Sequence, residues 1–160
     1  MFVVGCTKGG DQEIVNGSVY TVTSQLNGKR VFPALATDSS SGTISGIYDE
    51  SMNSLSFSLS YRKDSSVIKL DTLRMIRLFK SAAVAIDTGS ASRRFSLSTN
   101  ISAASRTNLT GTFNFGLMGN NGFSASEQTE FLTGNYYLIL YSSRFPNGLI
   151  GGQMAVTKNP

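Results

Sequence analysis

Carboxylates are the first residues to consider for chemistry, because the 160-residue sequence contains no histidine and a single cysteine, Cys6. The absence of histidine excludes Ser-His and Cys-His nucleophilic catalysis together with histidine-based metal sites. Acid–base catalysis by carboxylates needs two acids at a controlled distance, one of them with a raised pKa. The candidate pairs, Asp49 with Glu50 in a turn and Glu127 with Glu130 before a strand, are expected to be solvated instead. We therefore predict no catalytic residue, no cofactor and no metal site.

Cys6 is the candidate for covalent modification. The residues Val3-Val4-Gly5-Cys6 resemble the lipobox of bacterial lipoproteins, in which the cysteine is diacylated and becomes the mature N-terminus. The polar segment Thr7 to Glu13 suits a flexible tether, although a charged n-region and most of an apolar h-region are missing. The alternative is an unmodified start with a chance cysteine. We predict a lipoprotein-signal remnant and tether over residues 1–16, followed by a single domain over residues 17–160.

This interpretation predicts a location as well. A lipid on Cys6 would make the protein an outer-membrane lipoprotein of a bacterial cell envelope, facing the periplasm or the cell surface, with the membrane as a partner.

The charge distribution does not favour nucleic acid as a partner. The net charge is +4 and only 15% of the residues are charged. The basic residues are scattered, apart from Arg93-Arg94 and the set Arg74, Arg77 and Lys80, and no basic stripe with interleaved aromatics is present. A protein or a glycan remains as a possible partner. Abundant glycine, serine and threonine fit short strands joined by polar turns better than helices.

The segment Gly134 to Gln153 predicts the centre of the fold. Tyr136, Leu138 and Leu140 fall on one face of a strand, and Tyr137, Ile139 and Tyr141 fall on the other. A strand that is apolar or aromatic on both faces is covered on both sides, so it belongs in the middle of a sheet. Asn147-Gly148 then favours a tight reversal into a second strand.

The clearest alternation lies in Ser54 to Tyr61, where Leu55, Phe57, Leu59 and Tyr61 point inward and serines point outward. Such a strand has one dry face and one wet face, as in an antiparallel sandwich. Further strands are predicted by similar patterns: Ser18–Leu26, Val31–Thr37 with a bend at Pro33, Thr43–Tyr48, Ala82–Ile86, Arg94–Ser98 and Thr110–Leu117. Turns are expected over 38–42 and 49–53.

Two segments are less regular. Val67 to Phe79 has apolar residues at helical spacing, but Leu73, Met75, Arg77 and Phe79 would line one side of a strand, which we favour for the second half. Ser126 to Thr133 is expected to be a short helical turn. These elements predict an all-β fold, an antiparallel Greek-key β-sandwich of about eight strands.

Two blocks of sequence are similar to one family. Leu26 to Tyr61 resembles the opening of CHRD domains, found in chordin and in many bacterial secreted proteins: a proline-containing bend, a Gly-Thr strand, a Tyr-Asp turn and an alternating strand. Gly134 to Gln153 resembles the family's close, where a Gly-x-Tyr-Tyr strand runs into a Phe-Pro-x-Gly turn and a final Gly-Gln. The likeness covers roughly Tyr20 to Val156. It implies an antiparallel β-sandwich of immunoglobulin-like or superoxide-dismutase-like type, without the metal.

The sequence departs from that family where relatives carry polar residues. A His-x-His-x-Gly element of the family falls near Met75-Ile76-Arg77, and a His-Thr pair falls at Tyr141-Ser142. The acid and the arginine of a Gly-Glu-Ile-Arg-Gly motif become Leu149 and Gly151. No binding residue of the family carries over to these positions.

The expected function is that of a non-catalytic binding or structural module. The alternative is a hydrolase whose carboxylate pair is assembled from distant turns, which a cleft with two facing acids would favour. The tyrosines Tyr136, Tyr137 and Tyr141 are expected in the core, with a binding surface as the other possibility.

Overall fold

The computed structural model describes residues 17–32, 40–62, 72–80, 86–87, 92–102, 106–116 and 123–160. Several sequence-based predictions lie outside these residues. They include Cys6 with the whole of the tether over residues 1–16, the bend at Pro33, and most of the strand expected at Ala82–Ile86.

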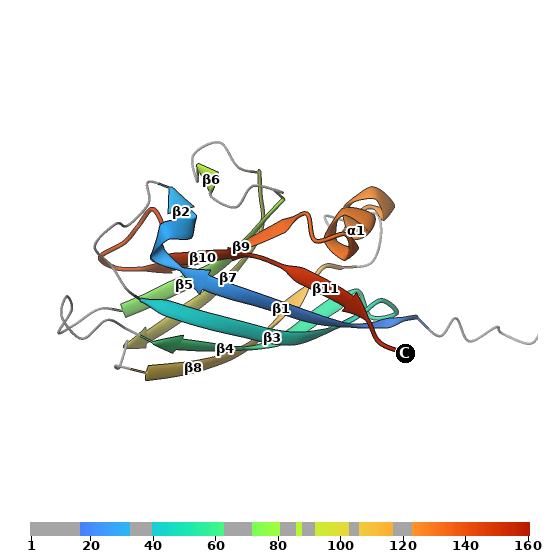
Figure 1. Cartoon of the computed structure of the whole chain (residues 1–160), viewed down its shortest axis with the longest axis horizontal. Coiled ribbons are helices and arrows are strands. Elements are labelled where there is room, and N and C mark those ends of the chain that lie inside the picture. The colour runs from blue at the N-terminus through green and yellow to red at the C-terminus, as the bar shows by residue number, and fades with distance from the viewer. Residues whose placement is uncertain are drawn as a thin grey trace, which may run out of the picture.

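The described part of the chain is nearly all antiparallel β-structure, and a single sheet holds nine of its strands. They are β1 (Val19–Asn27), β3 (Ser41–Asp49), β4 (Ser54–Arg62), β5 (Thr72–Lys80), β7 (Ser92–Ser102), β8 (Arg106–Asn114), β9 (Tyr136–Ser142), β10 (Ile150–Gln153) and β11 (Ala155–Lys158). Their spatial order is β7-β5-β9-β10-β1-β3-β4-β8, and β11 lies along β1 (Figure 1).

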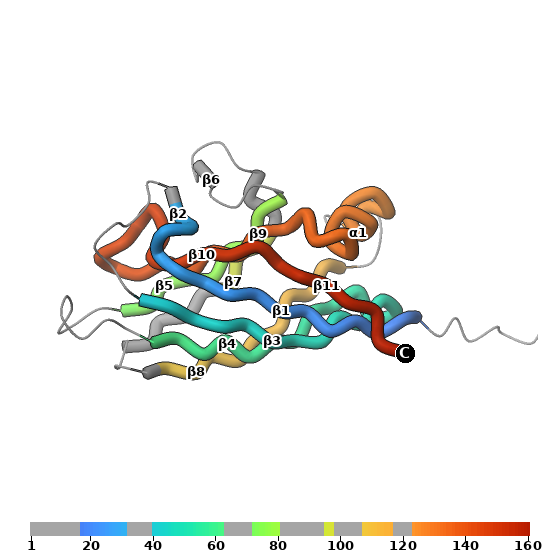
Figure 2. The backbone as a smooth tube through the Cα atoms, in the orientation of Figure 1, coloured from blue at the N-terminus to red at the C-terminus, as the bar shows by residue number. Residues whose placement is uncertain are grey.

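The sheet curls into a barrel-like sandwich. Its edge strands β7 and β8 follow each other in the chain and lie in contact, so the sheet almost closes on itself (Figure 2). Strand β8 returns to pair with β4 after the chain has passed through β5 and β7, as in Greek-key connections. The predicted antiparallel β-sandwich is confirmed.

Smaller elements cover one side of this sheet. The 3-10 helix η1 (Gly28–Arg30) leads into β2 (Val31–Phe32), which pairs in parallel with β6 (Ile86–Asp87) away from the main sheet. The helix α1 (Ala125–Leu132) covers one end (Figure 1). It begins with a capping box, in which the side chains of Ser124 and Glu127 bond each other's backbone N–H. The helical turn expected over 126–133 is therefore confirmed.

The alternation predicted for β4 is present. Leu55, Phe57, Leu59 and Tyr61 are buried, whereas Ser56, Ser58 and Ser60 are exposed. β1 and β3 alternate in the same way, so one face of this half of the sheet is dry and the other is wet. The turn expected over 38–42 is partly wrong, because Ser41 and Gly42 already belong to β3 and pair with Arg62 and Tyr61.

Strand β9 is the centre of the other half, as predicted. It lies between β5 and β10, and its residues are buried along its whole length. Tyr136, Leu138 and Leu140 pack in the main core. Tyr137 and Ile139 pack on the outer side in a second cluster that includes Val31. The loop back to β10 passes through Gly148, whose φ of 122° is the left-handed conformation expected of the Asn-Gly turn.

The second half of the segment Val67 to Phe79, for which both a helix and a strand were considered, is a strand. The predicted strand is confirmed as β5, Thr72–Lys80. The predicted face is corrected at one residue. Met75 and Phe79 pack on the outer side, but Leu73 lies in the main core. A β-bulge between Leu73 and Met75 shifts the register there, and one extra residue transfers a side chain to the opposite face.

An aromatic group fills the core near α1. Tyr48, Phe115, Phe123, Phe131 and Tyr136 lie with neighbouring ring centroids 4.0–6.0 Å apart. Such tilted and offset pairs add to the stability that burial alone provides.

A buried polar residue ties the β3–β4 turn to this aromatic group. The side chain of Asn53 accepts a hydrogen bond from the Tyr48 hydroxyl at 2.9 Å and donates one to the carbonyl oxygen of Gly116 at 2.7 Å. Gln128 of α1 donates to the same Tyr48 hydroxyl at 3.0 Å. The turn, the end of β8 and the helix are therefore held by one hydrogen-bonded network.

Candidate binding face

Each carboxylate of the predicted acid pairs is held by its own structural contact. A carboxylate oxygen of Asp49 accepts bonds from the backbone N–H groups of Ser51 and Met52 and from the Ser51 hydroxyl. These donors hold the pKa of Asp49 below its usual value. Glu50 accepts a bond from the backbone N–H of Ser18 at 3.1 Å.

The second pair, Glu127 and Glu130, belongs to the helix α1. Glu127 completes the capping box of α1. Glu130 forms a salt bridge with Lys80, whose Nζ lies 2.8 Å from the carboxylate. Among the residues that the structure describes, no three or more cysteine, aspartate or glutamate side chains gather as a metal site would require. Nothing in these contacts favours a hydrolase.

The tyrosines of β9 do not form a surface. Tyr136, Tyr137 and Tyr141 are at most 3% exposed. The Tyr137 hydroxyl donates a hydrogen bond to the carbonyl oxygen of Arg30. Burial raises the pKa of Tyr137 to about 12. These residues stabilise the sheet, and they leave no aromatic platform for a ligand.

The positions where the family carries histidines come together, although they are far apart in the sequence. Met75 of β5 pairs with Tyr141 of β9. The guanidinium carbon of Arg77 lies 4.8 Å from the centroid of the Tyr141 ring, in the geometry of a cation–π contact. The cation–π contact therefore joins β5 and β9 on the outer side of the sheet.

In the described part of the chain, the outer side of β1, β3, β4 and β8 is an exposed face with a regular arrangement, which we call the hydroxyl face. Its side chains are those of Thr21, Thr23, Gln25, Ser41, Thr43, Ser45, Ile47, Ser56, Ser58, Ser60, Arg62, Asn108, Thr110 and Thr112. Serine and threonine predominate because these strands alternate between an apolar inner side and a polar outer side.

The register aligns these side chains in rows across the strands. One row, formed by paired residues on adjacent strands, consists of Thr23, Ser45, Ser58 and Thr110. The next row consists of Gln25, Thr43, Ser60 and Asn108. Neighbouring strands are about 4.8 Å apart, and successive rows on one face are about 6.8 Å apart. The face is therefore a grid of hydroxyl and amide groups.

Two shallow depressions lie on this grid. One has a volume of about 350 Å³ and lies around Ser45, Ile47, Ser56 and Ser58. The other, of about 150 Å³, is lined by Gln25, Ser41, Gly42, Thr43, Ser60 and Arg62. Both are bordered by short side chains, which leave room above the strands. Ile47, 45% exposed, is the main apolar side chain on the face.

Sequence reasoning found the outward serines but not the face. Each alternating segment predicted its own wet side, and the outward serine positions of β4 were stated correctly. The pairing of β4 with β8, which brings Asn108 and Thr110 beside them, is a non-local contact that no local pattern predicts.

Cys6, the predicted lipid attachment site, lies outside the described residues. In the parts of the chain that are described, we find no helix with the length and apolar character needed to cross a membrane.

Comparison with known families agrees with the two blocks of similarity found in the sequence. The CHRD domain model matches residues 22–154, which is most of the chain. Neither a curated protein nor a solved structure matches significantly.

Proposed function

Because the chain belongs to the CHRD domain family, we propose that it is a non-catalytic binding or structural module and that the hydroxyl face is its binding surface. Family membership supports a module of this class. The assignment of binding to the hydroxyl face is part of our proposal.

One observation carries the proposal. The hydroxyl face presents rows of polar side chains, and although Ser56 bonds Thr112 and Thr21 bonds Asn159, the central side chains are free for a ligand. Among its described residues, the side chains of Thr43, Ser45, Ser58 and Ser60 are exposed and form no hydrogen bond within the chain. The four carboxylates of the candidate pairs, by contrast, are engaged by backbone groups, a helix cap and a lysine.

We also propose that the protein acts at a bacterial cell envelope, where a diacylated Cys6 anchors it in the membrane. The support is the sequence Val3-Val4-Gly5-Cys6 and the polar segment that follows it. A lipid anchor would hold the domain close to envelope polymers, which raises their effective concentration at the binding face.

The test is sedimentation of the purified protein with insoluble envelope material from bacterial cells. The decisive variant is Ser58→Glu, which places a bulky charge in the middle of the hydroxyl face. The matched control is Ser96→Glu, an identical change at an exposed serine of β7, a strand that does not contribute to the hydroxyl face. Denaturant unfolding of both variants establishes that they remain folded.

We expect Ser58→Glu to remain in the supernatant while the wild type and Ser96→Glu sediment with the envelope. A wild type that does not sediment would contradict a binding role at the envelope. Equal sedimentation of Ser58→Glu and the wild type would instead place the binding surface elsewhere on the domain.

A further inference from the structure

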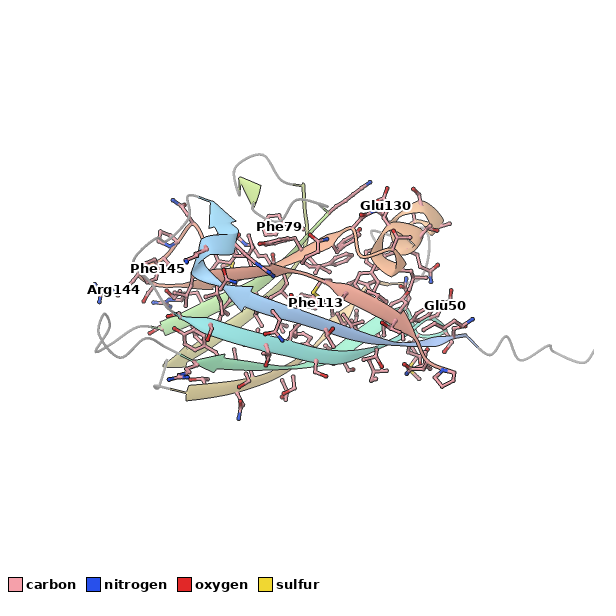
Figure 3. All side chains as sticks on the ribbon, viewed as in Figure 1. Glu50, Phe79, Phe113, Glu130, Arg144 and Phe145 are labelled. Carbon is pink, nitrogen blue, oxygen red and sulfur yellow. The ribbon has the colours of Figure 1, made fainter. Side chains whose placement is uncertain are left out.

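The acidic residues of the candidate pairs lie toward one end of the molecule, where Lys80 and Lys158 also lie. Glu50 and Glu130 lie toward one end in Figure 3, and Arg144 lies at the opposite end. Asp49 belongs with Glu50 at the β3–β4 turn. The hydroxyl face runs between these ends, with Asp49 at the acidic end of β3 and Arg62 at the basic end of β4, opposite Ser41.

Arg62 is available for an external partner. Its side chain is exposed, and it has no hydrogen bond or ion pair with any described residue. A second guanidinium lies close to the same end, because Arg30 donates a hydrogen bond from Nη1 to the carbonyl oxygen of Gln25 at 3.0 Å. A guanidinium has five N–H donors, so this single bond leaves most of them for a ligand.

Uncharged hydrogen-bonding groups lie between the arginines. The row Gln25, Thr43, Ser60 and Asn108 crosses the face next to Arg62. Gln25, Thr43 and Ser60 line the depression of about 150 Å³ together with Arg62. Hydroxyl groups can donate and accept, and amides offer both functions from separate atoms, so this row can match a partner rich in hydroxyls.

The composition of the face distinguishes between classes of partner. Protein interfaces concentrate aromatic and apolar anchors, whereas the large apolar side chains exposed on the described part of this face are Val19 and Ile47, and none is aromatic. Insertion into a lipid surface needs an apolar side. Single-stranded nucleic acid needs stacking aromatics, and the described part of the face has none. A polymer that carries many hydroxyls and an occasional anion fits both the grid and the arginines.

We propose that the ligand of the hydroxyl face is an acidic glycan, an inference that rests on the proposed function. Its separate carboxylate or sulfate groups pair with Arg62 and Arg30, while its sugar hydroxyls bond the row of Gln25, Thr43 and Ser60. Guanidinium pairs well with both kinds of anion because its planar fork donates two parallel hydrogen bonds. The absence of an exposed aromatic platform among the described residues of the face disfavours neutral sugars, whose C–H faces need such a ring to pack on.

The experiment is titration calorimetry with the full chain at 150 mM salt, using three probes. They are an oligogalacturonate, a neutral galactan oligomer of similar length, and polyglutamate as an anion that is not a glycan. Two variants act on different parts of the site. Arg62→Gln removes the charge, and Thr43→Val removes a hydroxyl at nearly constant volume. Lys158→Gln, which removes a charge at the other end of β1, is the control.

We expect measurable binding of oligogalacturonate only. Arg62→Gln should weaken it about five- to tenfold, Thr43→Val by a smaller factor, and Lys158→Gln less than about twofold. Equal binding of polyglutamate, with no effect of Thr43→Val, would overturn the proposal in favour of a general polyanion. If the neutral galactan binds as tightly as the oligogalacturonate, the inference that the ligand is acidic is wrong.

The two proposals fail in different ways. If no probe binds but Ser58→Glu still prevents sedimentation with envelope material, the hydroxyl face is a binding surface for another ligand and the glycan assignment is wrong. If the envelope is not bound either, both proposals are wrong.

Discussion

Substitution of Asn53 should show how strongly one polar residue holds the fold together. Asn53 is 7% exposed, and its side chain joins the Tyr48 hydroxyl to the carbonyl oxygen of Gly116. Its φ of 47° is in the left-handed region, where asparagine is tolerated better than other side chains. Asn53→Ala removes both hydrogen bonds and keeps a Cβ in the strained conformation. Asn53→Gly removes the same hydrogen bonds but relieves the strain.

The expected magnitudes follow from these contacts. In either variant the Tyr48 hydroxyl loses its acceptor, although Gln128 still donates to it. A buried group left without its partner costs about 1–3 kcal/mol. The left-handed conformation adds about 1–2 kcal/mol for alanine. We therefore expect Asn53→Ala to lower the free energy of unfolding by about 2–4 kcal/mol and Asn53→Gly by about 1 kcal/mol less.

The assay is urea unfolding followed by far-UV circular dichroism, because the chain has no tryptophan for fluorescence. Asn114→Ala, the same change at an exposed position of β8, should alter the free energy of unfolding by less than about 0.5 kcal/mol. A double-mutant cycle of Asn53→Ala with Tyr48→Phe should give a coupling of at least about 0.5 kcal/mol. A near-neutral Asn53→Ala, or an Asn53→Gly that is more costly, would refute the reasoning.

Further predictions concern the core, the pH response, the lipid and metals. Phe57 is 5% exposed and stacks on Phe113 at 5.3 Å, so Phe57→Ala should cost about 3–5 kcal/mol in denaturant melts, against less than about 0.5 kcal/mol for Ser58→Ala; similar values would invalidate the strand faces. The raised pKa of Tyr137, about 12 against about 10 in the unfolded chain, favours the neutral phenol in the fold. Its contribution to stability should be constant below pH 10 and fall as the pH rises toward 12, and Tyr137→Phe should flatten that decline. If Cys6 carries the proposed lipid in a bacterial cell, Cys6→Ser should release the protein from the membrane fraction, whereas a soluble wild type with a free thiol would exclude the anchor. Elemental analysis after dialysis should find no stoichiometric zinc or copper, since histidine is absent.

Much of the fold could be predicted because successive side chains of a strand point to opposite faces of the sheet, so a buried face shows as apolar residues at every second position. Leu55, Phe57 and Leu59 are buried as their spacing predicts. β9 is covered on both faces because apolar residues occupy both of its alternating sets. The Asn147-Gly148 reversal was equally local, since it depends on the left-handed φ that Gly148 adopts.

The candidate site was less accessible to sequence reasoning. Asp49 and Glu127 were expected to be solvated, and the structure adds that both carboxylates accept hydrogen bonds from neighbouring backbone groups. The hydroxyl face was not predicted, because outward serines on separate strands say nothing about which strands are adjacent. Arg77 was noted as part of a basic set and on one side of a predicted strand, but its contact with Tyr141 was not predicted, because it joins two strands that are distant in the chain.

The sequence by itself determined which residues of each strand face the core, where the chain reverses, and that histidine chemistry is absent. The tertiary structure alone decided that β8 pairs with β4, that a bulge turns Leu73 to the inner side, and that Arg62 lies beside a row of hydroxyl and amide groups. The physical reason is that alternation is a local property of a pleated strand. Strand order depends instead on which non-local pairing buries the most apolar surface and satisfies the most backbone groups, and that free energy belongs to the whole chain.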